Sequence, residues 1–240
     1  MKNYLFGYAR PVYNIWGPWK GFGLNPSWQE DHKVYEHMYK LSRLSAKHFL
    51  QGEWEEFCVT SPVLDARLHQ INVWYTIKEL WLKEPCNILC MGADTLFIKP
   101  TEVFGRYDKM TMFNYTDPKT HSEVVNYFND DVRYYPASMD PKVWEMGEKL
   151  MDKWFAHNEN NWAAGQIIHN LQMWSQGVAL NDVHDPNMAF QVLYFDEEQD
   201  SKWNGSPFED AHILHLHGSR GIQGRLPVME AILTQLGIEQ

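Results

Sequence analysis

The first hundred residues alternate between short apolar runs and longer segments with helical periodicity. The short runs at residues 4–8, 55–59 and 88–91 have the length and composition of buried strands. Between them, residues 31–48 and 64–82 place apolar side chains at helical spacing. Strand, helix, strand, helix, strand predicts a parallel sheet covered by helices, because parallel neighbours need a long crossover between them.

The rest of the chain continues the mixture of strands and helices. Asp140 followed by Pro141 is typical of a helix start, since Asp caps the free N–H groups and Pro fits the first turn. Further strands are expected over residues 109–114, 191–195 and 212–217, and further helices over 162–174 and 227–236. No repeat or linker interrupts the pattern, so we expect one α/β domain over residues 1–240, with a mixed, mostly parallel sheet flanked by helices.

Composition excludes several classes of partner. A chain of 240 residues with 44% apolar residues can bury a substantial core. The net charge of −10 argues against nucleic acid or an anionic membrane as the main partner, and no apolar run is long enough to span a bilayer. With no visible signal peptide and only three cysteines, we expect free thiols and a cytoplasmic location.

Asp94 stands just past the buried run at residues 88–91. That position is the C-terminal edge of the predicted sheet, where open α/β sheets bind their ligands. The segment Gly92-Ala93-Asp94-Thr95-Leu96 resembles the metal-binding segment of GT-A fold glycosyltransferases, in particular those of family eight, where an apolar strand runs into Asp-x-Asp. Here the second Asp is Asp94 and the first position is Gly92. Taken alone, the residues also fit a strand that ends in a tight glycine turn.

Two later segments resemble motifs of the same family, in the same order along the chain. Gln166 and Asn170 match the Gln-x-x-x-Asn helix, in which Gln lies near the anomeric carbon. His215 and Gly218 match the late His-x-x-Gly motif, in which His is a metal ligand and the following loop holds the diphosphate. The Lys position of that motif is Gly221 here.

The resemblance implies a GT-A fold and a glycosyltransferase that moves a sugar, with retention, from a nucleotide-sugar donor to a carbohydrate or glycoconjugate acceptor. Mn²⁺ or Mg²⁺ would be held by Asp94 and His215, and Asp94 and Gln166 would be the catalytic residues. The other residues expected to bind substrate are Arg10, Lys78, Ala93, Asn170, Asp185, Gly218 and Arg220. The acceptor is expected over residues 126–138 and 182–185.

Two alternatives remain open from the residues. In the family's motifs the position of Gly92 and the position just before Gln166, here Gly165, are acidic. Their replacement by glycine favours a catalytically silent nucleotide-sugar or carbohydrate-binding protein on the same fold. The cluster of His212, His215 and His217, together with Asp185, favours a metal-dependent hydrolase, since three imidazoles can hold a metal with an open position.

Overall fold

The computed structural model describes residues 1–8, 28–59, 66–115, 128–156, 164–177, 190–194, 211–218 and 221–239. Its larger sheet has five strands in the order β2-β1-β3-β6-β5. These strands are β1 (Asn3–Tyr8), β2 (Glu55–Val59), β3 (Asn87–Met91), β5 (Thr111–Tyr115) and β6 (Phe128–Tyr135).

The strand directions confirm the predicted mixed sheet. β1 runs parallel to both β2 and β3, while β6 is antiparallel to β3 and to β5. Because two reversals cancel, β5 points the same way as β3, and only β6 runs against the other strands. The interior position predicted for the run at residues 88–91 is also confirmed, since β3 lies between β1 and β6 and is buried along its whole length.

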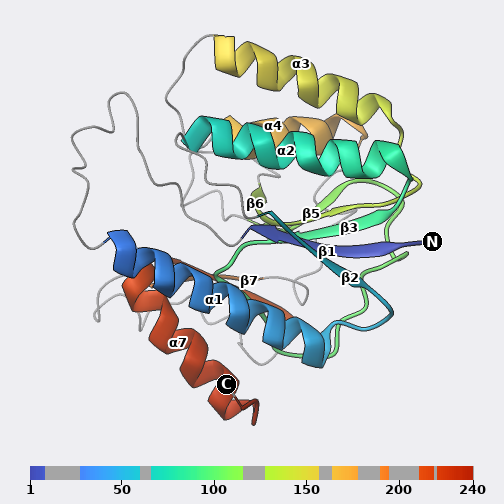
Figure 1. Cartoon of the computed structure of the whole chain (residues 1–240). Coiled ribbons are helices and arrows are strands. Elements are labelled where there is room, and N and C mark those ends of the chain that lie inside the picture. The colour runs from blue at the N-terminus through green and yellow to red at the C-terminus, as the bar shows by residue number, and fades with distance from the viewer. Residues whose placement is uncertain are drawn as a thin grey trace.

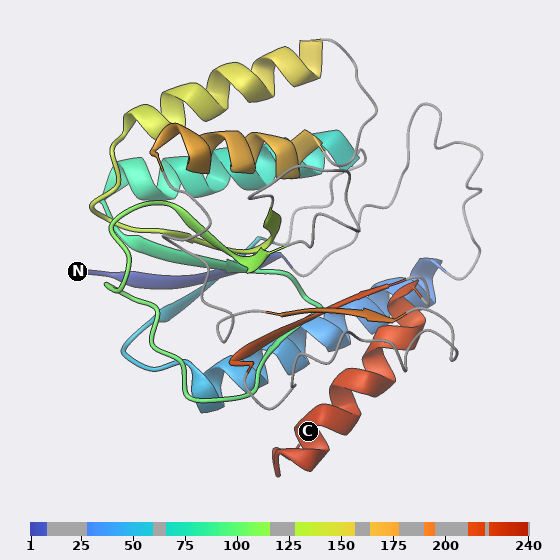
Figure 2. The same cartoon turned by 180° about the vertical axis from the view of Figure 1, so that it is seen from behind.

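Helices cover both faces of this sheet (Figure 1). On one face lie α2 (Ala66–Lys83), α3 (Lys142–Ala156) and α4 (Ala164–Ser175), with α3 outermost. On the other lie α1 (Trp28–Phe49) and α7 (Gly221–Gln235), the latter at the outer edge. The view from behind shows the same layers (Figure 2). The α/β class expected from the alternating pattern is therefore confirmed.

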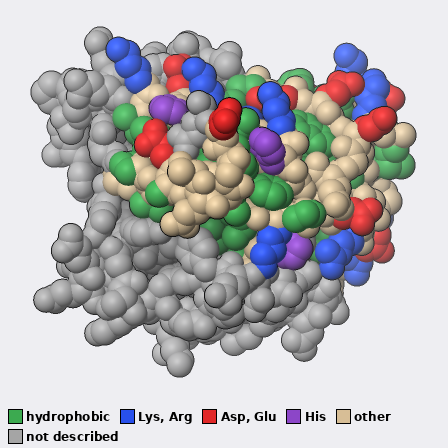
Figure 3. Space-filling model, turned by 90° about the horizontal axis from the view of Figure 1, so that it is seen from below, with side chains coloured by type: hydrophobic (Ala, Val, Ile, Leu, Met, Phe, Trp, Pro, Cys, Tyr) green, Lys and Arg blue, Asp and Glu red, His purple; other side chains and the backbone are tan. Residues whose placement is uncertain are grey.

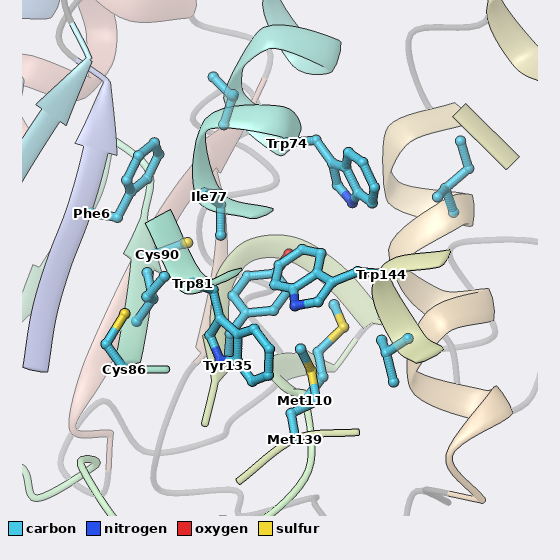
Figure 4. Close-up of a cluster of buried hydrophobic side chains, with 14 of the residues drawn as sticks. Phe6, Trp74, Ile77, Trp81, Cys86, Cys90, Met110, Tyr135, Met139 and Trp144 are labelled. Carbon is cyan, nitrogen blue, oxygen red and sulfur yellow. The ribbon is translucent and has the colours of Figure 1, made fainter. Parts of the chain in front are cut away.

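The face covered by α2 and α3 holds an aromatic core (Figure 4). The Trp144 ring stacks on Tyr135 with centroids 5.0 Å apart and meets the edge of Trp74 at 5.6 Å. Trp81 lies in the same cluster and donates its indole N–H to the Pro136 carbonyl at 2.9 Å, so its one polar group is satisfied. Much of the chain's aromatic content thus serves packing, where large rings bury about 150–250 Å² each.

A smaller sheet lies between the large one and α7. Its strands are β4 (Thr95–Phe97), β7 (Phe190–Tyr194) and β8 (Ile213–Gly218), in the order β4-β8-β7. β8 is parallel to β7 and antiparallel to β4. Apolar residues of β4 and β8 pack against α1 and α7 in a second core that includes Met38, Leu96, Leu214 and Met229. Because β8 pairs with β4, the small sheet places β8, near the C-terminus, next to the turn that follows β3.

Two elements differ from the sequence-based expectation. β6 was not predicted, because residues 132–135 are buried on both sides and therefore show no alternation of apolar and polar residues. Helix α7 begins at Gly221, well before Pro227, which lies inside it. A proline has no N–H to donate, so a start at Pro227 was the natural expectation. The helix nevertheless continues through that position.

The face formed by α1 and α7 has no single-sign charged region among its described residues (Figure 3). Apolar side chains gather near its middle, with basic and acidic ones around them. In the described part of the chain, no helix combines the length and the apolar character needed to cross a membrane.

Candidate metal centre

The turn that carries Asp94 joins β3 to β4 and is held at several points. The Thr95 hydroxyl donates to the Gly92 carbonyl at 2.6 Å, which closes the turn. The Leu216 N–H donates to the Asp94 carbonyl at 2.9 Å, which ties the turn to β8. The carboxylate of Asp94 is therefore presented at the C-terminal end of β3, the ligand-binding edge of such sheets. Its side chain is only 13% exposed.

His215 reaches Asp94 because β4 and β8 are paired. Thr95 lies opposite His215 in the antiparallel register, so the histidine stands next to the turn. Its Nε2 lies 2.9 Å from Asp131 Oδ2 and 3.6 Å from Asp94 Oδ2, and its side chain is fully buried. The two residues that the sequence named as metal ligands are thus brought together by the fold.

A third candidate ligand, Asp131, is positioned by an irregularity in β6. Met112 pairs with Arg133 and Asn114 pairs with Asn129, so residues 130–132 lie opposite Phe113 alone. Bulges of this kind bend a strand and turn side chains in new directions. Asp131 accordingly meets His215, whereas its neighbour Asp130 faces α4, with Oδ2 2.7 Å from His169 Nδ1.

Gly92 leaves the space that these carboxylates occupy. A Cβ atom at Gly92 would lie 2.8 Å from Asp94 Oδ1 and 3.4 Å from Asp131 Oδ1. The Gly92 N–H also donates to the Asp131 carbonyl at 3.1 Å, so the two residues are strand neighbours. Gly92 therefore leaves room for the carboxylate that Asp131 brings from the adjacent strand.

The donor set suits a divalent cation. One ligand atom each from Asp94, Asp131 and His215 can be chosen so that all lie within 4.8 Å of one another. Two carboxylate oxygens and one imidazole nitrogen form a mixed set that Mn²⁺ accepts readily, and Mg²⁺ also takes carboxylates while keeping several waters. Three protein ligands leave further positions for oxygens of a substrate. The residues present therefore fit a metal of this class.

The same group is also an ion-pair network with a fourth member, Arg225 of α7. Its Nη1 lies 2.5 Å from Asp94 Oδ2. Burial opposes charge at Asp94, yet His215 and Arg225 hold the pKa of its carboxyl well below the ordinary value. Burial likewise opposes charge at His215, but Asp131 and Asp94 raise the pKa of its imidazole to about 10. A metal ion bound here would take the place of the imidazole proton.

Comparison with solved structures finds the same architecture in a glycosyltransferase. A crystal structure of an enzyme involved in glycosylating the major capsid of the virus PBCV-1 superimposes with a TM-score of 0.52 at 14% identity, covering 96% of this chain and 100% of that one. The chain has a glycosyltransferase fold. The expected GT-A type α/β fold is thereby confirmed. No protein-family model matches the sequence, and no curated protein does either.

Two of the predicted substrate-binding side chains form contacts between elements of the fold. The Asn170 side chain is fully buried and pairs with the backbone N–H and carbonyl of Phe128 at 2.9 and 2.8 Å, which fastens α4 to β6. Lys78 forms an ion pair with Glu148 at 2.7 Å, which links α2 to α3. Both groups have partners within the fold, and the expectation that they bind substrate stays a prediction.

The remaining predicted residues have varied positions. Ala93 is buried in the turn just before Asp94. Gly218 ends β8 opposite Tyr194, three residues after His215. Both residues can offer a ligand only the polar groups of their backbone. Gln166 lies on α4, half-buried. Arg10, Asp185 and Arg220 lie outside the described residues, as does the expected acceptor segment 182–185. Tyr134 and Tyr135, within the other expected acceptor segment, are buried in the cores.

The histidine cluster does not form a shared metal site among the described side chains. His212 lies at the start of β8, with Nδ1 3.0 Å from the Pro100 carbonyl and 3.4 Å from Thr101 Oγ1. His215 lies three residues on, beside Asp94 and Asp131. The side chain of His217 lies outside the described part of the structure. A hydrolase site that uses His212 together with His215 is therefore not supported.

The sequence reasoning missed Asp131 and Arg225. Asp131 lies in the pair Asp130-Asp131, within residues 126–138, where the acceptor was expected to bind, and consecutive acidic residues are most often solvated. Arg225 lies five residues beyond Arg220, in a helix expected to begin only at Pro227. No local signal pointed to either residue, because β6 was not expected as a strand and the contact of Arg225 with Asp94 joins positions 131 apart.

A separate cavity of about 380 Å³ lies along α1, lined by residues that include His37, Arg43, Lys47 and Glu56. The metal-centre residues do not line it. Arg43 is nearly buried and lies near the carboxylate of Glu56, with its guanidinium over the Tyr39 ring at 4.5 Å. These contacts explain its position as packing between α1 and the sheet.

Proposed function

We propose that this chain is a divalent-metal-dependent glycosyltransferase that uses a nucleoside diphosphate sugar. The observation that carries the proposal is the group of Asp94, Asp131 and His215 at the C-terminal end of β3 in a glycosyltransferase fold. Carboxylates at that edge are well placed to hold a cation for a ligand bound across the sheet.

The proposed chemistry is leaving-group stabilisation. Asp94, Asp131 and His215 would hold Mn²⁺ or Mg²⁺, which when bound offsets the charge of the departing diphosphate. The turn at Gly92 and its ties to β8 keep the carboxylates fixed, so little reorganisation is needed. Further donor contacts are proposed from the backbone at Gly218 and from Arg220 and Arg10, since glycine amides and guanidinium groups suit phosphate oxygens.

The likeness to family eight supports finer parts of the proposal. Gln166 is proposed to lie beneath the sugar, where a neutral amide can stabilise developing charge. It lies one helical turn before His169, the residue held by Asp130 next to the metal ligand Asp131. A retaining reaction and a carbohydrate or glycoconjugate acceptor are proposed from the same likeness, within a single catalytic domain.

The direct test is calorimetry with a panel of uridine and guanosine diphosphate sugars, in Mn²⁺ and in EDTA. We expect nucleotide-sugar binding that depends on Mn²⁺. The affinity for the nucleotide sugar should fall at least about tenfold in Asp94→Ala, Asp131→Asn and His215→Ala, because each variant removes one of the three candidate metal ligands and so weakens metal binding. Asp108→Asn removes the charge of an exposed carboxylate elsewhere and serves as the matched control.

Two results would contradict the proposal. One is the absence of heat with every nucleotide sugar in the presence of metal. The other is equal binding in EDTA together with wild-type affinity in Asp94→Ala, which would make Asp94 a turn residue only.

A second candidate function, a nucleotide-sugar-binding protein without turnover, is favoured by one observation. Arg225 and His215 already balance the charges of Asp94 and Asp131 without a metal. Release of nucleotide from a bound donor distinguishes the candidates: an enzyme releases it, slowly with water and faster with an acceptor, whereas a binding protein returns the donor intact.

A further inference from the structure

Arg225 already fills one side of the proposed metal centre with positive charge. Its guanidinium contacts Asp94 at 2.5 Å, and its side chain is 18% exposed while that of Asp94 is 13% exposed. An ion pair withdrawn from water to this extent is stronger than a pair at the surface. A divalent cation that approaches Asp94 therefore meets a cation already in contact with the same carboxylate.

Arg225 lies shortly after β8 in the chain. It lies in the second turn of α7, which begins three residues after the end of β8. The guanidinium lies beside Asp94, and part of its side chain is exposed. Arginine is suited to phosphate because its planar group offers several N–H donors at once.

We propose that the Arg225 guanidinium pairs with Asp94 while the site is empty. When a metal-bound diphosphate enters, the guanidinium leaves Asp94 and binds the diphosphate. This inference rests on the proposed function, and it deepens that function by naming a phosphate-binding residue. It also gives a physical reason for a coupling: the metal binds weakly to the free protein, and a diphosphate strengthens it by drawing Arg225 away from Asp94. By linkage, the metal strengthens diphosphate binding by the same factor.

The test uses the whole chain, freed of metal, with Mn²⁺ and inorganic pyrophosphate as probes. Pyrophosphate carries the shared diphosphate chemistry and does not require the base or sugar to be known. Mn²⁺ affinity is measured by water-proton relaxation, with and without pyrophosphate, in the wild type, Arg225→Gln and Arg225→Lys. Arg106→Gln, which removes an exposed guanidinium elsewhere, is the control.

The expected results for Arg225→Gln go in opposite directions. Mn²⁺ alone should bind about tenfold more tightly than to the wild type, because the competing cation is gone. Pyrophosphate in saturating Mn²⁺ should bind about tenfold more weakly, because the guanidinium is missing. The coupling between the two ligands should fall accordingly.

Arg225→Lys keeps the positive charge near Asp94, so its affinity for Mn²⁺ alone should stay close to that of the wild type. Its affinity for pyrophosphate should fall, because lysine lacks the planar guanidinium. This variant covers the case in which Arg225→Gln does not fold.

Three results would overturn the inference: unchanged Mn²⁺ affinity in Arg225→Gln, unchanged pyrophosphate affinity in both variants, or no coupling in the wild type. Its failure is separable from that of the proposed function. Binding of a nucleotide sugar with no effect of Arg225 would leave the transferase standing. An Arg225 effect on Mn²⁺ and pyrophosphate without any nucleotide-sugar binding would overturn the proposed function and leave only the coupling between metal and diphosphate.

Discussion

Among single residues, the main feature is that neighbouring strands supply the two carboxylates of the candidate site. Gly92 has no side chain, and Asp131 of β6 lies beside it and contacts His215. A metal site needs its ligand atoms in position and does not depend on which strand supplies them. Gly92 is then a requirement of the arrangement, because any side chain there would compete with the carboxylates for space.

Gly92→Ala tests that requirement. Its Cβ would stand 2.8 Å from Asp94 Oδ1, so the carboxylate must shift. We expect Mn²⁺ affinity, measured with pyrophosphate present, to fall by about tenfold to a hundredfold, as when the support of a metal ligand is disturbed. A thermal melt of the same variant separates this effect from a general loss of stability. Wild-type Mn²⁺ affinity in a folded Gly92→Ala variant would show that the carboxylates can accommodate a side chain at position 92, and that glycine is not required there.

At the scale of elements, the helical layer over the sheet depends on a close approach at Gly147 of α3. A Cβ there would lie 2.3 Å from Gln172 Nε2 and 2.6 Å from Trp74 Cζ2. Gln172 is fully buried, donates to the Val143 carbonyl at 3.0 Å and accepts from the Trp74 indole N–H at 3.3 Å. One amide thus joins α2, α3 and α4, and the missing side chain at Gly147 makes room for it.

Gly147→Ala should therefore destabilise the protein although alanine is the better helix former. Overpacking against Gln172 and Trp74 is expected to cost about 1–3 kcal/mol, more than the helix propensity gained. Urea denaturation followed by tryptophan fluorescence measures the difference. Lys149→Ala, exposed on the same helix, should stay within about 0.5 kcal/mol of the wild type. A stabilised Gly147→Ala would mean that the three helices can separate without cost.

At the scale of the whole molecule, four residues distant in the chain converge at one edge of the sheet. Asp94 and Arg225 are 131 positions apart, and Asp131 and His215 lie between them in the sequence. They come together because β8 returns to pair with β4 and because α7 then packs against α1. A ligand that bridges these groups should stabilise the folded chain as a unit.

A thermal-shift experiment checks this. Mn²⁺ with a nucleotide sugar at about 100 times its dissociation constant should raise the melting temperature by about 5–10 °C, because ligand binding to the folded state alone contributes about 2.7 kcal/mol. Either component alone should have a smaller effect. A full shift with Zn²⁺ alone, which no nucleotide increases, would instead support a metal-dependent hydrolase.

Most elements of the fold and two members of the candidate site, Asp94 and His215, could be predicted from local sequence patterns. Periodicity is a local property, so α1, β2, β3 and α4 lie close to where apolar spacing predicted them. Asp94 was found because it follows a buried strand, and His215 because it resembles a known motif. These signals can be read within about ten residues of the chain.

Tertiary structure alone decided the rest. β6 is buried on both faces, so no alternation reveals it, and the extra residues in its pairing with β5 are what turn Asp131 toward His215. Arg225 meets Asp94 because β8 and α7 return to the end of β3. A bulge and a long-range contact depend on which strands are neighbours. Neighbours are set by the packing of the whole chain, and no local pattern of residues records them.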